Sequence, residues 1–429
     1  MVAPPTDQEL RTRRVRLHPE RRRRSDVVVA VLLAVLLVGG AVVLWGMSPA
    51  ARTTSTPSPV PIEPPPPAAG APAALAEVWR AVSIATSVPV VAGSAVITAE
   101  GSRVVGRDAL TGNEHWSYQR DRELCALGSG FPGADDGRGR VLALYAGTDD
   151  WCSELTALRP DTGERATASN PEARRGTRLL ADGSFVLATG TDYIEVMRSD
   201  LVKTLEYGNA PTPVQPGRQP RPGCTYGSVT LTTDRLGVIE RCPGEPTDRL
   251  TVVAPDGEGD ADQPEVEFSV ALPSPGAVLV ELSADRAAVA LPGPPRLLLL
   301  DNTGQQVDLL DLDVPAADLA ADPPGGVGAV ASDGERVYWW TGSRTVALDV
   351  IDLVPRWTLP GALGPAISYG GALLVPVPDA IVEVDPARGV ALRAIPVDRA
   401  EDGPVRLAAL GEVLLEQRGT QLVALRPAG

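Results

Sequence analysis

Residues 89–119 read PVVAGSAVITAEGSRVVGRDALTGNEHWSYQ, and this stretch decides the fold of the chain. Three short apolar runs are separated by Gly-Ser pairs at 93–94 and 101–102, and the segment DALTG at 108–112 leads into a fourth, aromatic run. Runs rich in β-branched and aromatic residues and separated by Gly, Asp and Asn are typical of strands joined by tight turns. Four such strands form one antiparallel sheet, which cannot bury both of its faces alone. The stretch therefore predicts a sheet that packs between neighbours of the same kind.

Similar blocks recur along the whole chain. They begin near residues 88, 138, 178, 226, 281, 327, 365 and 405. This spacing is typical of the four-stranded blades of a β-propeller. The last block supplies only three strands before residue 429, and residues 77–83 (EVWRAVS), ahead of the first block, look like the missing fourth. We expect an all-β, eight-bladed propeller that closes in this way. Seven blades remain the alternative because the third and fourth blocks are degenerate.

The residues that follow each third strand are of types that favour a tight turn. An Asp or Asn side chain can accept a hydrogen bond from the backbone two residues on, and Gly supplies a positive φ. A Trp follows such turns at Trp116 and Trp357, and Trp79 lies in the segment expected to complete the last blade. Because an indole is a large apolar plate, we expect these three Trp residues to pack blade against blade.

The pattern A-x-D-x-x-T-G-x-x-x-W is clearest at residues 106–116, with Gly106 in place of the Ala. It resembles the repeat of pyrroloquinoline-quinone-like β-propellers, and the resemblance covers roughly residues 75–429. That superfamily contains quinoprotein alcohol dehydrogenases and non-catalytic scaffolds such as the β-barrel-assembly lipoprotein of Gram-negative envelopes. A quinoprotein dehydrogenase would need an adjacent-cysteine ring, a catalytic Asp and a calcium-binding Glu/Asn set, and none of these matches here. The resemblance therefore implies the fold and the scaffold type. We expect no catalytic, cofactor-binding or metal-binding residues.

The N-terminal region predicts a membrane anchor. Residues 1–25 carry eight arginines and three acidic residues, and residues 27–46 are twenty uncharged, mostly apolar residues. A helix of that length spans a bilayer, and the arginine excess favours a cytoplasmic N-terminus. A cleaved signal peptide is the alternative, because residues 48–51 (SPAA) are small, although the apolar run exceeds the usual h-region of about 7–15 residues. The expected divisions are a cytoplasmic tail (1–25), a transmembrane helix (26–47), a linker (48–73) and an extracytoplasmic propeller (74–429).

The linker has the composition of a spacer. Residues 48–72 are rich in Pro, Ala and Thr and carry few charges. Such a segment cannot build a core and favours polyproline II, which would reach about 75 Å if fully extended. We expect it to hold the propeller away from the membrane.

Charge and cysteines describe the domain beyond the anchor. The chain carries a net charge of −15, and because residues 1–26 contribute +4, the remainder carries −19. Such an acidic domain should not bind nucleic acid or anionic lipid surfaces. All four cysteines lie beyond the anchor, in a compartment where disulfides persist. Three pairings are possible. The one between sequence neighbours joins Cys125 to Cys152 and Cys224 to Cys242. A metal site is disfavoured because no C-x-x-C motif occurs.

Three further segments invite functional interpretations that we weigh against structural ones. His115 is the only histidine beyond the anchor, and no G-x-S-x-G element accompanies it, so a strand residue is favoured over a catalytic base. Residues 256–262 (DGEGDAD) carry oxygen ligands suited to Ca²⁺, but their spacing differs from an EF-hand and favours a solvated loop. Residues 338–340 (YWW) should be covered by adjacent blades on both faces. A carbohydrate or peptide platform at the propeller mouth is the alternative.

The best candidate for contact with a partner is the insertion at 209–223 (NAPTPVQPGRQPRPG). It is Pro-rich and carries Arg218 and Arg221 on an otherwise acidic domain, although it would also suit a variable loop between blades. We expect a monomeric, membrane-anchored propeller that binds unidentified envelope proteins as a scaffold. The alternatives are a quinone- or metal-dependent enzyme and a ligand sensor, each using the central funnel.

Overall fold

The computed structural model describes residues 24–48, 50–147, 151–210, 217–256, 261–400 and 403–428. It divides into two compact units, Met1–Arg52 and Thr53–Gly429. The described part of the first unit is dominated by helix α1 (Arg24–Met47), and the second unit is built from β-strands. Most of the expected cytoplasmic tail, residues 1–23, lies outside the described residues.

Helix α1 has the length and composition of a membrane-spanning segment. Its charged residues, Arg24 and Asp26, lie in the first turn, and no described residue of the helix is buried. Twenty-four residues at 1.5 Å each give about 36 Å, which exceeds a hydrocarbon core of about 30 Å. The helix is apolar all round, which suits lipid better than the surface of a soluble domain. A signal sequence near an N-terminus has the same properties.

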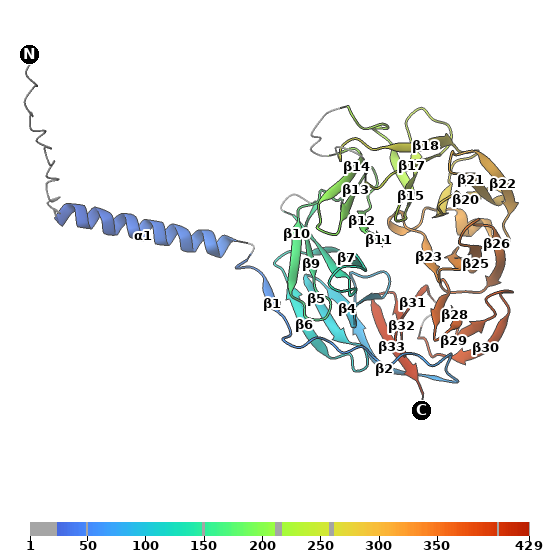
Figure 1. The fold of residues 1–429 in the computed structure, drawn as a ribbon, viewed down its shortest axis with the longest axis horizontal. Helices are drawn as coiled ribbons and strands as arrows, with labels where there is room; N and C mark the ends of the chain where they lie inside the picture. The colour runs from blue at the N-terminus through green and yellow to red at the C-terminus, as the bar shows by residue number, and fades with distance from the viewer. Residues whose placement is uncertain are drawn as a thin grey trace, which may run out of the picture. The chain divides into compact units, whose positions relative to one another are not determined.

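The second unit is a ring of eight antiparallel sheets, as the sequence predicts (Figure 1). Blade 1 contains β3 (Val90–Ala92), β4 (Ala95–Glu100), β5 (Arg103–Asp108) and β6 (Glu114–Gln119). Blade 2 contains β7 (Leu124–Gly130), β8 (Arg140–Ala146), β9 (Cys152–Leu158) and β10 (Arg165–Ser169). Blade 3 contains β11 (Leu179–Asp182), β12 (Phe185–Ala188), β13 (Tyr193–Arg198) and β14 (Lys203–Gly208). Blade 4 contains β15 (Thr225–Leu231), β16 (Leu236–Arg241), β17 (Arg249–Val253) and β18 (Val266–Ala271).

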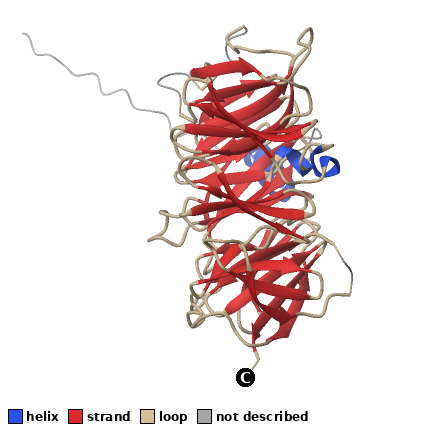
Figure 2. Ribbon diagram, turned by 90° about the vertical axis from the view of Figure 1, so that its right-hand side faces the viewer, coloured by secondary structure: helices blue, strands red, loops and turns tan. Residues whose placement is uncertain are grey.

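The second half of the ring repeats this order from the axis outwards. Blade 5 contains β19 (Val278–Leu282), β20 (Arg286–Pro292), β21 (Pro295–Asp301) and β22 (Gln306–Asp311). The short helices η1 (Ala316–Leu319) and η2 (Pro324–Gly326) lead to blade 6, with β23 (Ala329–Ser332), β24 (Arg336–Trp340), β25 (Arg344–Asp349) and β26 (Pro355–Pro360). Blade 7 contains β27 (Ile367–Tyr369), β28 (Ala372–Val377), β29 (Ala380–Val384) and β30 (Ala391–Pro396). Seen from the edge, strands make up almost all of the ring (Figure 2).

Blade 8 closes the ring by combining both ends of the propeller. It contains β31 (Val405–Leu410), β32 (Val413–Arg418), β33 (Gln421–Pro427) and β2 (Leu75–Val82). Strand β2 pairs with β33 from Leu75↔Pro427 to Val82↔Gln421, and the blue strand lies beside the red one in Figure 1. The prediction that residues 77–83 supply the missing strand is confirmed.

One predicted block boundary is wrong. Blade 2 begins at β7, well before residue 138, because the glycines of β7 weaken its apolar pattern. Those glycines are a packing requirement. A Cβ added to Gly130 would lie 2.7 Å from Val186 Cγ2 of blade 3, and one added to Gly128 would lie 3.2 Å from Leu179 Cβ. The apolar sequence pattern that would mark this strand is therefore weak, because close packing against the next blade requires glycines.

The core consists of eight clusters of buried apolar side chains among the described residues, one between each pair of adjacent blades. Burying one Val, Leu or Ile side chain contributes about 1.5–3 kcal/mol. Because each blade places both faces in such a cluster, no blade is stable without its two neighbours. The stability of the whole ring therefore depends on closure by β2.

The turn before the fourth strand of blade 1 forms as the sequence suggests. The Asp108 carboxylate accepts hydrogen bonds from the backbone N–H groups of Leu110 and Thr111, at 3.0 and 2.8 Å. Gly112 then adopts a φ of 71°. In blade 6 the equivalent position is Leu353, which has a φ of 56° although it is not glycine.

Each of the three predicted packing Trp residues contacts the turn of the following blade. The indole N–H groups donate to backbone carbonyls three residues before the turn glycine: Trp79 to Ala109 (2.8 Å), Trp116 to Pro160 (2.7 Å) and Trp357 to Pro386 (2.9 Å). The glycines themselves lie against the rings. An added Cβ would come within 2.5 to 2.6 Å of the indole at Gly112, Gly163 and Gly389. The sequence motif thus joins a Trp in one blade to a Gly in the next.

The expected spacer is corrected for residues 54–72, which pack on the propeller. Strand β1 (Thr54–Thr56) pairs with the outer strand β6 and makes a fifth strand of that sheet. Ile62 is only 5% exposed and belongs to the core between blades 1 and 2. Further along, the Glu412 N–H donates to the Pro66 carbonyl at 2.7 Å. A Pro-rich chain lacks backbone donors but keeps its carbonyl acceptors, and here the rim of the ring supplies the donors.

The disulfides join the sequence neighbours, as expected. Cys125 bonds to Cys152 and Cys224 bonds to Cys242. The first joins strands β7 and β9 within blade 2, and the second flanks the hairpin of β15 and β16 in blade 4. Both bonds therefore stabilise single blades and do not link one blade to another.

Candidate functional site

The predicted partner loop, residues 209–223, connects β14 of blade 3 to β15 of blade 4. Residues 211–216 of this loop lie outside the described residues. Its start is held where the Asn209 side chain donates to Asp192 at 3.3 Å and accepts from the Gly223 N–H at 2.9 Å. The Gln219 amide donates to the Glu206 and Asp262 carbonyls at 2.9 and 3.0 Å. Both described ends of the loop are thus fixed to the propeller.

The two arginines of this loop have different surroundings. Arg221 Nε lies 2.7 Å from Oε2 of Glu240, a fully buried carboxylate, and Arg221 also pairs with Glu245. Since a buried carboxylate needs a paired cation, Arg221 has a structural role in blade 4 beside the second disulfide. Arg218 is exposed and donates to Gln263 at 2.9 Å. Of the two predicted contact residues, Arg218 is the one presented to solvent.

The acidic segment at 256–262 adjoins the same loop. Residues 257–260 lie outside the described residues. Around them, the Pro255 carbonyl accepts from Thr204 Oγ1 at 2.8 Å and the Ala261 carbonyl accepts from the Glu206 N–H at 2.7 Å. The described ends of this connection therefore lie along the outer edge of β14. The described residues contain no group of three or more His, Cys, Asp or Glu side chains placed to hold a metal ion.

His115 contacts the segment that leads into the ring. Its Nε2 lies 2.6 Å from the Val60 carbonyl, so the tautomer that carries a proton on Nε2 donates this hydrogen bond. The imidazole thereby helps to hold residues 54–72 on blade 1. The structural interpretation of His115 fits this contact.

The aromatic segment 338–340 divides between two environments. Tyr338 is fully buried in the core between blades 6 and 7, and Trp339 is buried in the core between blades 5 and 6. Trp340 is partly buried, and its indole N–H donates to the Ala362 carbonyl at 2.7 Å. Its ring faces the guanidinium of Arg406, whose Cζ lies 4.6 Å from the ring centroid. Adjacent blades thus cover Tyr338 and Trp339, as the sequence predicts. Trp340 instead borders the central channel.

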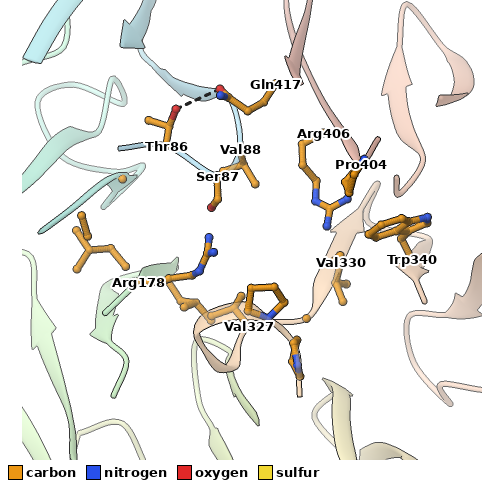
Figure 3. A pocket seen from close by; sticks show the side chains of 18 of the residues that line it. Thr86, Ser87, Val88, Arg178, Val327, Val330, Trp340, Pro404, Arg406 and Gln417 are labelled. Atoms are coloured by element: carbon orange, nitrogen blue, oxygen red, sulfur yellow. Dashed lines mark hydrogen bonds between the residues drawn. The ribbon is translucent and has the colours of Figure 1, made fainter. Parts of the chain in front are cut away.

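A cavity of about 920 Å³ occupies the central channel at the end where the inner strands begin. Its walls come from β7, from the starts of β11, β23 and β31, and from the connections that precede β3 and β23. Figure 3 shows Arg178 and Arg406 extending into this space from different blades, with Trp340 beside Arg406. The charged residues that line the cavity are Arg178, Arg406, Asp318 and Asp322.

The two aspartates of the cavity are engaged by other residues. Asp318 accepts hydrogen bonds from the Thr341 hydroxyl at 2.5 Å and from the Ser343 N–H and hydroxyl at 3.1 and 2.8 Å. Asp322 forms a two-pronged pair with Arg241, at 2.5 and 2.7 Å. Their charges are therefore directed away from the two arginines of the cavity.

The two arginines have no acidic partner among the described residues. Burial lowers the pKa of Arg178, and burial together with the charge of Arg178 lowers the pKa of Arg406 to about 10. Nη1 of Arg406 is buried without a hydrogen-bond partner. Motif analysis of the sequence missed both residues. The available signal was a cation at the start of a strand next to the propeller axis, in TRLLA (177–181) and VRLAA (405–409).

Comparisons with known proteins address the fold. No family model and no curated protein matches the sequence. Similar solved structures include BamB from Moraxella catarrhalis, with 13% identity and a TM-score of 0.49 over 82% of this chain and 98% of that one. The computationally designed protein Ika8 has 14% identity and a TM-score of 0.52, over 87% of this chain and 100% of that one. Dihydro-heme d1 dehydrogenase NirN in complex with DHE has 17% identity and a TM-score of 0.48, over 85% and 73% of the two chains.

At these identities the likeness concerns architecture alone. The described residues form an eight-bladed β-propeller with four-stranded antiparallel blades, preceded by one apolar helix. The turn motif at residues 106–116 is the part of the sequence that resembles the pyrroloquinoline-quinone-like repeat.

Proposed function

We propose that this chain is a membrane-anchored scaffold of the bacterial envelope. In this proposal α1 crosses the cytoplasmic membrane, residues 1–25 remain in the cytoplasm, and the propeller lies outside and binds other envelope proteins. The observation that carries the proposal is the joining of a rigid closed ring to a helix that is apolar on all sides. The eight arginines that precede the apolar run support the orientation.

The chemistry of the propeller supports an extracytoplasmic position. Two disulfides persist more readily outside the reducing cytosol. The charge of −19 beyond residue 26 favours solubility and disfavours nucleic acid as a partner. The negative electrostatic potential of the propeller should attract proteins that carry basic surface patches.

The length of the free connection changes the expected mechanism. Since β1 already pairs with blade 1, only residues 48–53 connect α1 to the folded ring. Six residues can span at most about 20 Å, compared with about 75 Å for a spacer of 25 residues. The proposed scaffold therefore works with a short tether, and the inter-blade loops carry the contacts.

Loop 209–223 is the proposed contact region, with Arg218 as its exposed cation. Its described ends are anchored by Asn209, Gln219 and Arg221. An anchored loop loses less conformational entropy on binding than a free one. Arg218 suits an acidic group on a partner protein.

Co-purification tests this function. The full-length tagged chain would be crosslinked in its native cells, and the captured proteins would be identified by mass spectrometry. We expect a reproducible set of envelope proteins whose yield falls about tenfold in R218E, because the charge reversal replaces attraction by repulsion. The control is R388E, which reverses another exposed arginine in a turn of blade 7. An unchanged set of proteins from R218E would contradict the role of the loop.

The rival function is an enzyme that uses a quinone or a metal in the funnel. It predicts an absorbing cofactor, or metal in a stoichiometric amount, in the full-length protein purified in detergent. Absorption spectra and elemental analysis of that preparation distinguish the two functions. A stoichiometric cofactor in a preparation without protein partners would overturn the scaffold proposal.

A further inference from the structure

Two cationic side chains face the central cavity, whereas the domain as a whole is strongly acidic. The contrast with other buried arginines is informative. The fully buried arginines of the described chain each pair with a glutamate: Arg120 with Glu154, Arg235 with Glu267 at 2.9 Å, and Arg399 with Glu416 at 2.6 Å. These three buried arginines thus each have an acidic partner, whereas Arg178 and Arg406 have none among the described residues.

Arg406 is held in place without being neutralised. Its guanidinium lies over the ring of Trp340, which fixes its direction, and Nη1 has no hydrogen-bond partner. The indole N–H of Trp340 is already bonded to Ala362, so only the ring face is offered to the cation. Leaving a buried polar group of a cation unpaired is costly. Because Nη1 is closed off from solvent, an anion in the cavity would not bond this atom. It would instead balance the charge of the guanidinium, which has no acidic partner among the described residues.

Arg178 lies against a turn shaped to admit it. Gly325 of η2 has a φ of 66°, and a Cβ added there would lie 2.6 Å from Arg178 Nε. No side chain larger than glycine fits at this position without moving the arginine. The backbone of the connection between blades 5 and 6 thus accommodates a cation that comes from blade 3.

We propose that the central cavity binds a small organic anion, one that carries at least two carboxylate groups or a phosphate, between Arg178 and Arg406. The planar guanidinium fork matches carboxylate and phosphate oxygens. The remaining walls suit a short organic body, because Val88, Val327 and Val330 are apolar while Thr86 and Gln417 are polar. A volume of about 920 Å³ is within the range of small-molecule sites. This site is additional to the scaffold function and does not depend on it.

The test is a titration of the full-length chain in detergent with citrate, succinate and inorganic phosphate at constant ionic strength. We expect calorimetry to show saturable binding of at least one of them. We also expect R178M and R406M to weaken that binding by at least about tenfold, since each variant removes a charge-assisted hydrogen bond to the anion. The matched control is R165M, which removes an exposed arginine on the outer strand β10.

A second measurement separates a ligand-binding arginine from a structural one. In anion-free buffer, R406M should melt at or above the temperature of the unmodified chain, because methionine keeps the apolar contact with Trp340 and removes an uncompensated charge. The added anion should raise the melting temperature of the unmodified chain and of R165M, but not that of R406M. The proposal is overturned if none of the three anions binds, if all variants bind equally, or if R406M melts well below the unmodified chain. Binding of an acidic peptide alone would also overturn the small-molecule assignment.

Discussion

At the scale of single residues, four of the eight contacts between blades contain a pair made of an aromatic ring and a glycine. Trp116 of blade 1 donates to the Pro160 carbonyl, and Gly163 of blade 2 lies under its ring. In the degenerate blade 4, Phe268 takes the same place over Gly304 of blade 5. The indole supplies buried area and a hydrogen bond, whereas the phenyl ring supplies area alone. The pair is therefore the unit that the sequence repeat preserves.

Substituting Gly163 by Ala tests this pair. Its φ of 73° already disfavours a side chain, and the added Cβ would lie 2.6 Å from Trp116 Cδ2. We expect the free energy of unfolding to fall by about 2–4 kcal/mol, from backbone strain of about 1 kcal/mol plus the overpacking. The matched control is Gly101→Ala, where φ is 61° and no atom lies within 4 Å of the added Cβ. Chemical unfolding should show a loss of about 1 kcal/mol there. Equal losses at both sites would contradict the role of the ring contact.

Glu281, on the inner strand β19, makes the stability of the propeller depend on pH. Burial raises the pKa of its carboxyl from 4.5 to about 7, and the Leu282 N–H that it accepts offsets this only in part. The folded state then binds the proton more tightly than the unfolded state. The stabilisation by protonation is complete below pH 4.5 and is lost as the pH rises towards 7.

The variant E281Q should remove this dependence. Glutamine keeps an acceptor for the Leu282 N–H and cannot ionise. We expect E281Q to be more stable than the unmodified chain by up to about 3 kcal/mol at pH 8 and equally stable at pH 4. Unfolding curves measured across that range check the expectation. A difference that does not vary with pH would contradict it.

At the scale of elements, sequence and structure agree where the signal is local. The strand runs, the DALTG turn at 108–112 and the closing strand at 77–83 could be predicted, because alternation and turn chemistry lie within a few residues. Strand β1 could not, since a three-residue strand has no periodicity and its Pro-rich surroundings suggest a spacer. The pair Arg178 and Arg406 also could not be predicted. These residues are far apart in the chain, and only closure of the ring brings them to one cavity.

Ile62 tests whether residues 54–72 belong to the folded ring. It is 5% exposed within the core between blades 1 and 2. Ile62→Ala should lower the free energy of unfolding by about 2–4 kcal/mol, as for other buried large-to-small substitutions. Val60→Ala is the control, because Val60 is 62% exposed, and its effect should stay within about 0.5 kcal/mol. If Ile62→Ala has no larger effect than Val60→Ala in chemical unfolding, the segment is a spacer after all.

At the scale of the whole molecule, the ring is stabilised by eight interfaces between blades and closed by one strand. The two disulfides lie within single blades, so closure depends on the pairing of β2 with β33. A closed ring has a fixed shape, and its loops and channel can therefore carry separate tasks. The loop after blade 3 is the proposed protein contact, and the channel is the proposed anion site.

The measurement that tests the central claim most directly is photocrosslinking from single positions of the full-length chain in its native cells. A photoreactive amino acid would replace Arg218 in the partner loop or, as the control, Arg165 on β10, and the adducts would be identified by mass spectrometry. An extracytoplasmic scaffold predicts discrete adducts with envelope proteins from position 218 and few from position 165. Adducts with cytoplasmic proteins, or no adduct from position 218 above the control, would contradict the account.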